Sequence, residues 1–271
     1  KLFFLIGYIS CLTAQQYVPI VLVHGVLSDK YGMEPTVHYI RKYMGDQVYV
    51  KNVQLGYGEY TSLTNVYSQA EFLRKAIQSD PLLKDGFNFV VHSQGGLVSR
   101  YYLEHYNNPP VLTYISWGSP QQGVFGLPGT LDSTFSWLDY LEGYAHHVLY
   151  SWAFQKYVSF AGYWHDSLHY DLYIKKACFL PYLNNEIMHA RSQQYKRNIC
   201  ALKHMVLVMS YNEDIVEPRE SCHFGFYKPH TLELQTLFES DLYREDRLGL
   251  KALYEAKKLH LLYADCTHGN F

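Results

Sequence analysis

The stretch Phe87-Asn88-Phe89-Val90-Val91-His92-Ser93-Gln94-Gly95-Gly96 decides the fold, because an apolar run leads directly into a serine followed by two glycines. Residues 97–103 then have the composition of a helix. A serine on a sharp turn between a strand and a helix is the setting of a nucleophile elbow, which lifts the hydroxyl above the sheet. The usual pattern is Gly-x-Ser-x-Gly, and Val91 replaces its first glycine. Taken alone, the segment is also compatible with an ordinary strand-to-helix turn.

Length and composition indicate one globular α/β domain. The chain has 271 residues, of which 48% are hydrophobic and 18% charged, enough for a substantial core. A net charge of -2 and the lack of a basic block give no reason to expect a nucleic-acid partner. The aromatic content of 17% is compatible with a groove of flat side chains, or with a compositional bias toward tyrosine.

Residues 1–14 have the pattern of a secretory signal that is incomplete at its start. They combine a positive first residue, an apolar centre and a small residue, Ala14. The apolar run is too short to span a bilayer, and a buried N-terminal strand is the alternative. No other segment has the length and hydrophobicity of a membrane span, so we expect no integral membrane part.

The cysteines predict disulfide bonds in a secretory protein. Of the 5 cysteines, Cys11 would leave with the signal, and Cys178, Cys200, Cys222 and Cys266 would remain. An even number allows two bridges with three alternative pairings. The spacings do not resemble a zinc site, and the sequence contains no N-glycosylation sequon.

β-rich runs alternate with helical patterns along most of the chain. This alternation predicts a mainly parallel central sheet with helices on both faces. The predicted strands are 17–23, 48–50, 87–91, 111–117, 204–209 and 259–263, and the predicted helices are 34–44, 64–77 with Thr64 as N-cap, 97–103 and 246–258.

The alternation lapses between about residues 123 and 200, where aromatic residues are dense. An aromatic-rich insertion over the catalytic edge would have this character, and so would a set of core helices. We therefore expect one domain over residues 15–271 that contains this segment. No closing helix follows the last strand, which suggests that the sequence is truncated at its C-terminus.

A serine nucleophile needs a base and an orienting acid, and the sequence offers both in suitable places. In α/β-hydrolase folds they follow in the order serine, acid, histidine, each in a loop after a strand. Here Ser93 is followed by the acidic loop 212–218, with Glu213 and Asp214, and then by His268. His92 lies next to the nucleophile and is expected to pack or hydrogen-bond elsewhere.

The transition state also needs two backbone donors for its oxyanion. The amide of Gln94, directly after the serine, is one candidate. The turn His24-Gly25-Val26 follows the first buried strand and can supply the other, from Val26. A plain strand-ending turn is the alternative explanation of His24-Gly25.

Several longer strings resemble the palmitoyl-protein thioesterase family, lysosomal enzymes that remove fatty acyl groups from cysteine. The similarity extends from about residue 19 to 268 and is carried by six strings: 93–96 (SQGG), 122–128 (QGVFGLP), 163–166 (YWHD), 215–218 (IVEP), 224–227 (FGFY) and 246–251 (DRLGLK). The resemblance implies an α/β-hydrolase with a helical insertion that forms a groove for the acyl chain.

The resemblance also implies roles for individual residues. Ser93 matches the nucleophile, His268 the base, and the amides of Val26 and Gln94 the oxyanion hole. Glu213 occupies the position of the family's aspartate, with Asp214 as the other candidate acid. We expect the acyl groove in the aromatic insertion, at Phe125, Phe160 and Trp164.

The expected reaction is hydrolysis of long-chain acyl thioesters of proteins or peptides, in the lysosome or after secretion. Burial of about sixteen carbons offers on the order of 10 kcal/mol, so the apolar groove should dominate substrate choice. The alternatives are a general lipase or carboxylesterase acting on oxygen esters, and an inactive acyl-binding relative. The sequence indicates no metal and no organic cofactor, and the expected chemistry requires neither.

Overall fold

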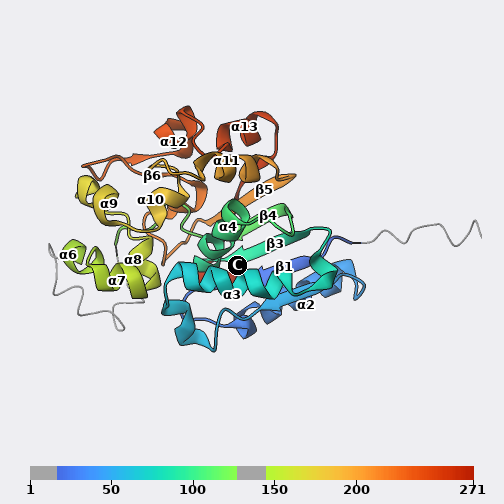
Figure 1. Ribbon diagram of the computed structural model, residues 1–271. Helices are drawn as coiled ribbons and strands as arrows, with labels where there is room; N and C mark the ends of the chain where they lie inside the picture. The colour runs from blue at the N-terminus through green and yellow to red at the C-terminus, as the bar shows by residue number, and fades with distance from the viewer. Residues whose placement is uncertain (1–16, 127–144) are drawn as a thin grey trace, which may run out of the picture.

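The computed structural model describes residues 17–126 and 145–271, so the predicted signal at residues 1–14 lies outside the described residues. A six-stranded sheet in the order β2-β1-β3-β4-β5-β8 forms the centre of the molecule (Figure 1). Every neighbouring pair in it is parallel, which confirms the predicted sheet. The strands are β1 Ile20–Val23, β2 Val50–Val53, β3 Phe87–His92, β4 Val111–Trp117, β5 His204–Ser210 and β8 Leu259–Ala264.

Helices cover both faces of this sheet. On one face lie α3 (Val66–Gln78), α4 (Gln94–His105) and α11 (Ser192–Cys200), and on the other lies α2 (Glu34–Met44) (Figure 1). Alternate residues of β3 serve the two faces: Phe89 and Val91 belong to the core under α3 and α4, whereas Val90 packs with α2. Burial on both sides explains why the central strands are continuous apolar runs.

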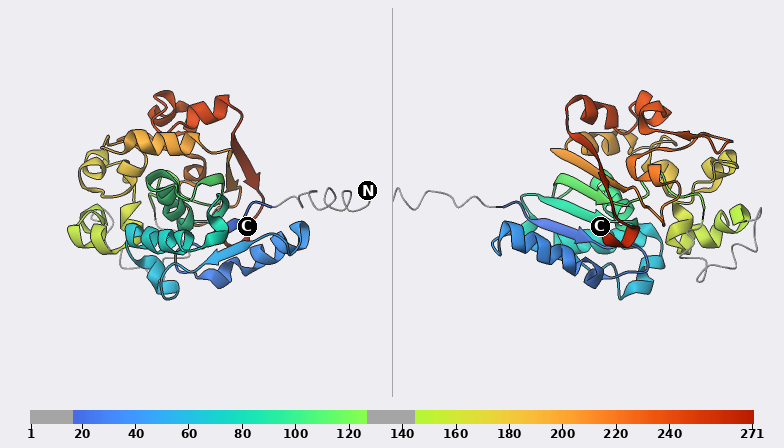
Figure 2. Two further views of the ribbon diagram at one scale, coloured as in Figure 1. Left: turned by 45° about the vertical axis from the view of Figure 1, so that its right-hand side comes forward. Right: turned by 180° about the vertical axis from the view of Figure 1, so that it is seen from behind.

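The segment from residue 145 to 200 folds into short helices: α6 Ala145–Leu149, α7 Trp152–Tyr157, α8 Ser159–Gly162, α9 Tyr170–Lys176, α10 Leu180–Leu183 and α11. The right view of Figure 2 shows the yellow-green helices on the side toward which the strand arrows point. Phe160 and Trp164 nevertheless belong to the main hydrophobic core. The segment therefore has features of both an insertion and a set of core helices. Its helices lie at the carboxyl ends of the strands, and some of its residues belong to the core.

Several predicted boundaries are wrong: the first strand begins at Ile20 rather than at residue 17, and the helix expected at 97–103 spans Gln94–His105. The second strand was expected at 48–50 and instead runs from Val50 to Val53. Asn65, not Thr64, caps α3, because the Asn65 side-chain oxygen Oδ1 accepts a hydrogen bond from the Tyr67 amide. The last helix, expected over 246–258, is only α13 (Leu250–Glu255), because Asp246 and Gly249 take positive φ angles of 51° and 85°.

No pattern in the sequence indicated a small antiparallel pair, β6 (Phe226–Tyr227) with β7 (Leu234–Gln235). The remaining elements are single turns: η1 Lys30–Met33, η2 Glu59–Leu63, η3 Pro81–Leu83, η4 Arg219–His223, η5 Leu237–Glu239, α12 Asp241–Arg244 and η6 His268–Asn270.

The expected disulfide bonds are not formed in the described residues. Cys178, Cys200, Cys222 and Cys266 are all free, with Cys178 exposed and Cys222 buried. Among the described helices, none has the length and hydrophobicity needed to cross a bilayer.

Candidate active site

Ser93 occupies a strained turn between β3 and α4. Its φ of 53° and ψ of -131° lie outside the regions that residues with a side chain normally adopt. The Ser93 amide donates to the Trp117 carbonyl oxygen at the end of β4, at 2.9 Å. The strand–turn–helix geometry is therefore that of a nucleophile elbow, as the sequence pattern predicted.

Glycines allow neighbouring segments to approach this turn closely. A methyl group on Gly25 would lie 2.9 Å from the Ser93 Cβ, closer than real side chains approach. A methyl on Gly95 would collide with the His24 carbonyl oxygen, and one on Gly96 with the Ser119 hydroxyl. These contacts give a physical reason for the Gly95-Gly96 pair, whereas Val91 is accommodated in the buried core.

His268 lies in η6, after β8, and contacts Glu213 from the loop after β5. Its Nδ1 is 2.6 Å from the Glu213 Oε1. That oxygen also accepts hydrogen bonds from the amides of Ile215 and Val216, both at 3.1 Å. The Asp214 carboxylate instead accepts the His268 backbone amide at 3.0 Å. The two acids left open by the sequence thus contact different parts of the histidine, and Glu213 faces the ring.

His92 contacts His268, and the sequence did not specify this contact. The His92 Nε2 lies 2.9 Å from the His268 carbonyl oxygen, so it donates to that oxygen. Burial, followed by the neighbouring His268, lowers the pKa of His92 to about 4. His92 is therefore neutral near pH 7 and orients the histidine loop without competing for its proton.

The turn after β1 is ordered by hydrogen bonds of the His24 ring. His24 donates through Nδ1 to the Gly25 carbonyl at 2.9 Å and accepts the Leu55 amide on Nε2 at 3.2 Å. Burial lowers the pKa of His24, which favours this neutral form. Val26 follows Gly25 in this turn, and Gln94 begins α4 directly after Ser93. The roles of their amides as oxyanion donors remain predictions.

A cavity of about 300 Å³ opens at Ser93, at the lower end of the range for small-molecule sites. Ser93 and His268 both line it, together with Gly25 and Val26. Apolar side chains form much of the remaining wall, namely Leu27, Met33, Trp117, Ile215 and Phe271. The serine and the histidine therefore share one cavity, whose wall is largely apolar.

Phe125, Phe160 and Trp164 are not among the residues that line this cavity. Phe125 and Trp164 pack against each other with ring centroids 5.6 Å apart. The neighbouring Tyr163 donates its hydroxyl hydrogen bond to the Gln94 side chain at 2.9 Å. These aromatic residues thus lie in a segment that contacts the elbow through Gln94, and their role in acyl binding remains a prediction.

The parallel sheet and the histidine–carboxylate pair beside an elbow serine define the class of protein. This is a hydrolase with the α/β-hydrolase fold. The family model described as "Palmitoyl protein thioesterase" matches residues 19–268, and the chain belongs to that family.

Curated relatives agree over most of their length. The chain is 38% identical to palmitoyl-protein thioesterase 3 of Dictyostelium discoideum, covering 92% of this chain and 84% of the relative. It is 34% identical to palmitoyl-protein thioesterase 1 of Caenorhabditis elegans, covering 94% and 87%. With the lysosomal thioesterase PPT2 of Homo sapiens it shares 30% identity, covering 88% and 77%.

Solved structures are more distant. A putative aryl esterase from Burkholderia cenocepacia aligns with 94% of this chain and 84% of its own at 15% identity and a TM-score of 0.47. An extracellular α/β-hydrolase from a Paenibacillus species aligns with 94% and 92% at 14% identity and the same TM-score of 0.47.

Proposed function

We propose that Ser93, His268 and Glu213 act together to hydrolyse long-chain acyl thioesters of proteins or peptides. The observation that carries this proposal is the 2.6 Å contact between the His268 Nδ1 and the Glu213 Oε1, on a histidine that shares a cavity with Ser93. A carboxylate on Nδ1 fixes the tautomer that leaves Nε2 free to accept a proton.

The reaction then proceeds in two halves. The Ser93 oxygen attacks the thioester carbonyl while His268 takes its proton, and the tetrahedral intermediate collapses by breaking the carbon–sulfur bond. His268 returns the proton to the leaving sulfur, which departs as a free thiol. Water, deprotonated by the same histidine, then attacks the acyl-serine, and His268 returns the proton to the Ser93 oxygen as the bond to the fatty acid breaks.

Charge on the carbonyl oxygen is stabilised by the amides of Val26 and Gln94. Gly25 allows the turn that carries the Val26 amide to approach Ser93 closely. The Gln94 amide lies at the start of α4, directly after Ser93. Preorganised backbone donors of this kind are a large part of acyl-transfer catalysis, about 10²–10³-fold for one donor.

For the acyl chain we propose the helical insertion, with Phe125, Phe160 and Trp164. This proposal is supported by their aromatic character and by the contact of Tyr163 with Gln94. The apolar wall of the cavity at Ser93 would receive the first carbons of the chain.

Because a relative is named a lysosomal thioesterase, we further propose that the protein works in the lysosome.

Replacing Ser93 by alanine tests the mechanism. We expect the wild-type protein to hydrolyse a palmitoyl-cysteine peptide faster than the matched palmitoyl-serine peptide. Ser93→Ala should lower kcat by roughly 10⁴-fold or more. Released thiol and fatty acid are measured in both proteins, and unfolding curves show whether the variant is folded.

Two other outcomes would support the alternatives. Faster turnover of the oxygen ester would indicate a general lipase or carboxylesterase. Binding of palmitate by a protein whose Ser93 does not react with a fluorophosphonate probe would indicate an inactive acyl-binding relative. Equal hydrolysis by the wild-type protein and Ser93→Ala would exclude the serine mechanism.

A further inference from the structure

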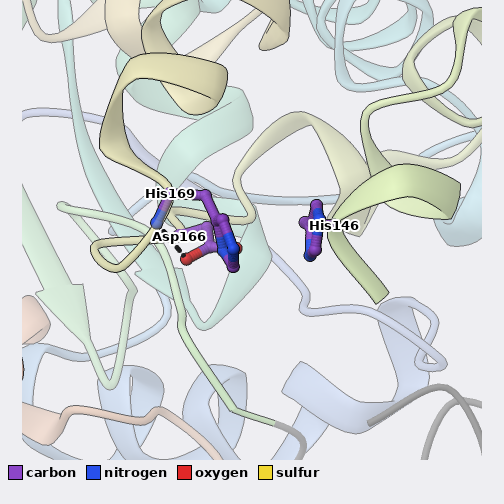
Figure 3. A group of neighbouring side chains, drawn as sticks. All are labelled: His146, Asp166 and His169. Carbon is purple, nitrogen blue, oxygen red and sulfur yellow. Dashed lines mark hydrogen bonds and ion pairs between the residues drawn. The ribbon is translucent and has the colours of Figure 1, made fainter. Parts of the chain in front are cut away.

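A second cluster of reactive side chains lies outside the hydrolase site, at the junction of α6 and the loop before α9. It consists of His146, Asp166 and His169 (Figure 3). One nitrogen of each histidine and one carboxylate oxygen all lie within 4.8 Å of one another. Among the described residues this is the one group of three or more such ligands at this spacing.

We propose that these three residues bind a divalent metal ion of the zinc class, with an open position toward solvent. Two imidazole nitrogens and one carboxylate oxygen are ligands that Zn²⁺ accepts at about 2.0–2.2 Å. His146 and Asp166 are buried, whereas the His169 side chain is 48% exposed. An ion would therefore enter from the His169 side.

The backbone already holds the ligand-bearing segments together. The Tyr150 hydroxyl accepts the Asp166 amide at 3.0 Å and donates to the Trp164 carbonyl oxygen at 3.2 Å. The Tyr150 amide in turn donates to the His146 carbonyl at 3.0 Å. These bonds fix α6 against the 164–166 segment, so His146 and Asp166 are brought together by the fold rather than by the ion.

The Asp166 carboxylate is held in place by His169. One of its oxygens accepts the His169 amide at 2.9 Å, and the other lies 3.0 Å from the His169 Nδ1. Within the described chain, His169 is its one ion-pair partner, although the carboxylate is buried. A buried carboxylate with so little positive charge around it gains from a bound metal ion.

The two histidines need a small adjustment. Their rings stack with centroids 3.9 Å apart and planes 22° from parallel. Bound to one tetrahedral ion, ligand atoms are roughly 3.3 Å apart, so the group must contract and the His146 ring must turn.

Metal titration of the purified full chain tests this site. We expect one equivalent of Co²⁺ to give visible absorption that Zn²⁺ displaces. His146→Phe and His169→Phe each keep an aromatic ring but lose a ligand, and each should weaken binding at least about tenfold. The control is the double variant His204→Ala/His260→Ala. It removes a histidine pair whose Nδ1 and Nε2 atoms lie 3.1 Å apart, and this pair has no third ligand among the described residues. It should bind like the wild type.

A direct measurement on the unmutated protein does not depend on the folding of the variants. Crystals soaked in Zn²⁺ should show an anomalous peak at the zinc edge between His146, Asp166 and His169. The proposal is overturned if the wild type binds no ion at micromolar concentrations. It is equally overturned if folded site variants bind like the wild type, or if the anomalous peak lies only elsewhere.

Discussion

Glu213 and Asp214 are neighbours in the sequence, yet they contact different atoms of His268. Glu213 approaches the ring and Asp214 the backbone amide. We expect Glu213→Ala to lower kcat by roughly 10³–10⁴-fold, because the imidazole loses the group that fixes its tautomer and stabilises its charge. Asp214→Ala removes one hydrogen bond at an exposed site and should cost less than about tenfold. Steady-state rates on a palmitoyl-cysteine peptide measure both.

The matched variant Glu213→Gln separates charge from packing. It keeps the shape of the buried side chain and its contacts with the Ile215 and Val216 amides, but cannot stabilise an imidazolium as a carboxylate does. A loss close to that of Glu213→Ala is expected. The assignment of the acid fails if Asp214→Ala is the more damaging of the two alanine variants.

At this scale, the sequence could predict the residue types but not every contact. Order along the chain and position after a strand were enough to select Ser93, His268 and an acidic pair. They could not decide between Glu213 and Asp214, because adjacent loop residues can point in either direction. The role of His92 was inaccessible for a similar reason: its partner is a backbone carbonyl 176 positions away in the sequence.

At the scale of elements, the turn between β1 and η1 has to approach α4 closely. A methyl on Gly25 would press on the Ser93 Cβ and move the Val26 amide. We therefore expect Gly25→Ala to lower kcat about 10²–10³-fold, the effect of losing one oxyanion donor. The unfolding temperature should change by only a few degrees. An unchanged kcat in a folded Gly25→Ala protein would mean that Val26 is not an oxyanion donor.

Helices and strands could be predicted accurately where hydrophobic periodicity was clear. The predicted ranges 34–44 and 111–117 match α2 and β4 residue for residue, because periodicity and flanking turn residues agree there. The 246–258 prediction was too long, since helical composition hides the positive φ angles of Asp246 and Gly249. In the insertion, aromatic density could not separate core from groove, and Phe160 and Trp164 are core members.

The molecule buries ionisable side chains outside its hydrolase site. One of them, Glu186, should make the stability of the folded protein depend on pH. Its carboxylate accepts from the Tyr173 hydroxyl at 3.2 Å and from the Asn184 amide at 3.3 Å. Its second oxygen is buried and has no hydrogen-bond partner among the residues that the structure describes. Burial raises the pKa of Glu186 to about 7, so the folded protein holds this proton at pH values where the unfolded chain releases it.

The sign of the effect on stability follows from proton linkage. The ordinary pKa of a glutamate side chain is 4.5. At pH values below it, Glu186 is protonated in both the folded and the unfolded protein, and its contribution to the free energy of unfolding is fully present. It is lost as the pH rises through about 7, with an upper magnitude of about 3 kcal/mol. In an acidic compartment, Glu186 would therefore contribute more to the stability of the folded protein than at neutral pH.

We expect Glu186→Gln to remove this dependence, because glutamine resembles the protonated acid and does not ionise. Relative to the wild type, the variant should gain stability on going from pH 5 to pH 8, measured as the difference in urea unfolding free energy. Glu255→Gln, at an exposed position on α13, is the matched control and should track the wild type at both pH values. If Glu186→Gln also tracks the wild type, the carboxyl group is ionised in the folded protein at pH 5 as it is at pH 8. The buried pocket around it must then supply compensating hydrogen bonds, which bound water would have to provide.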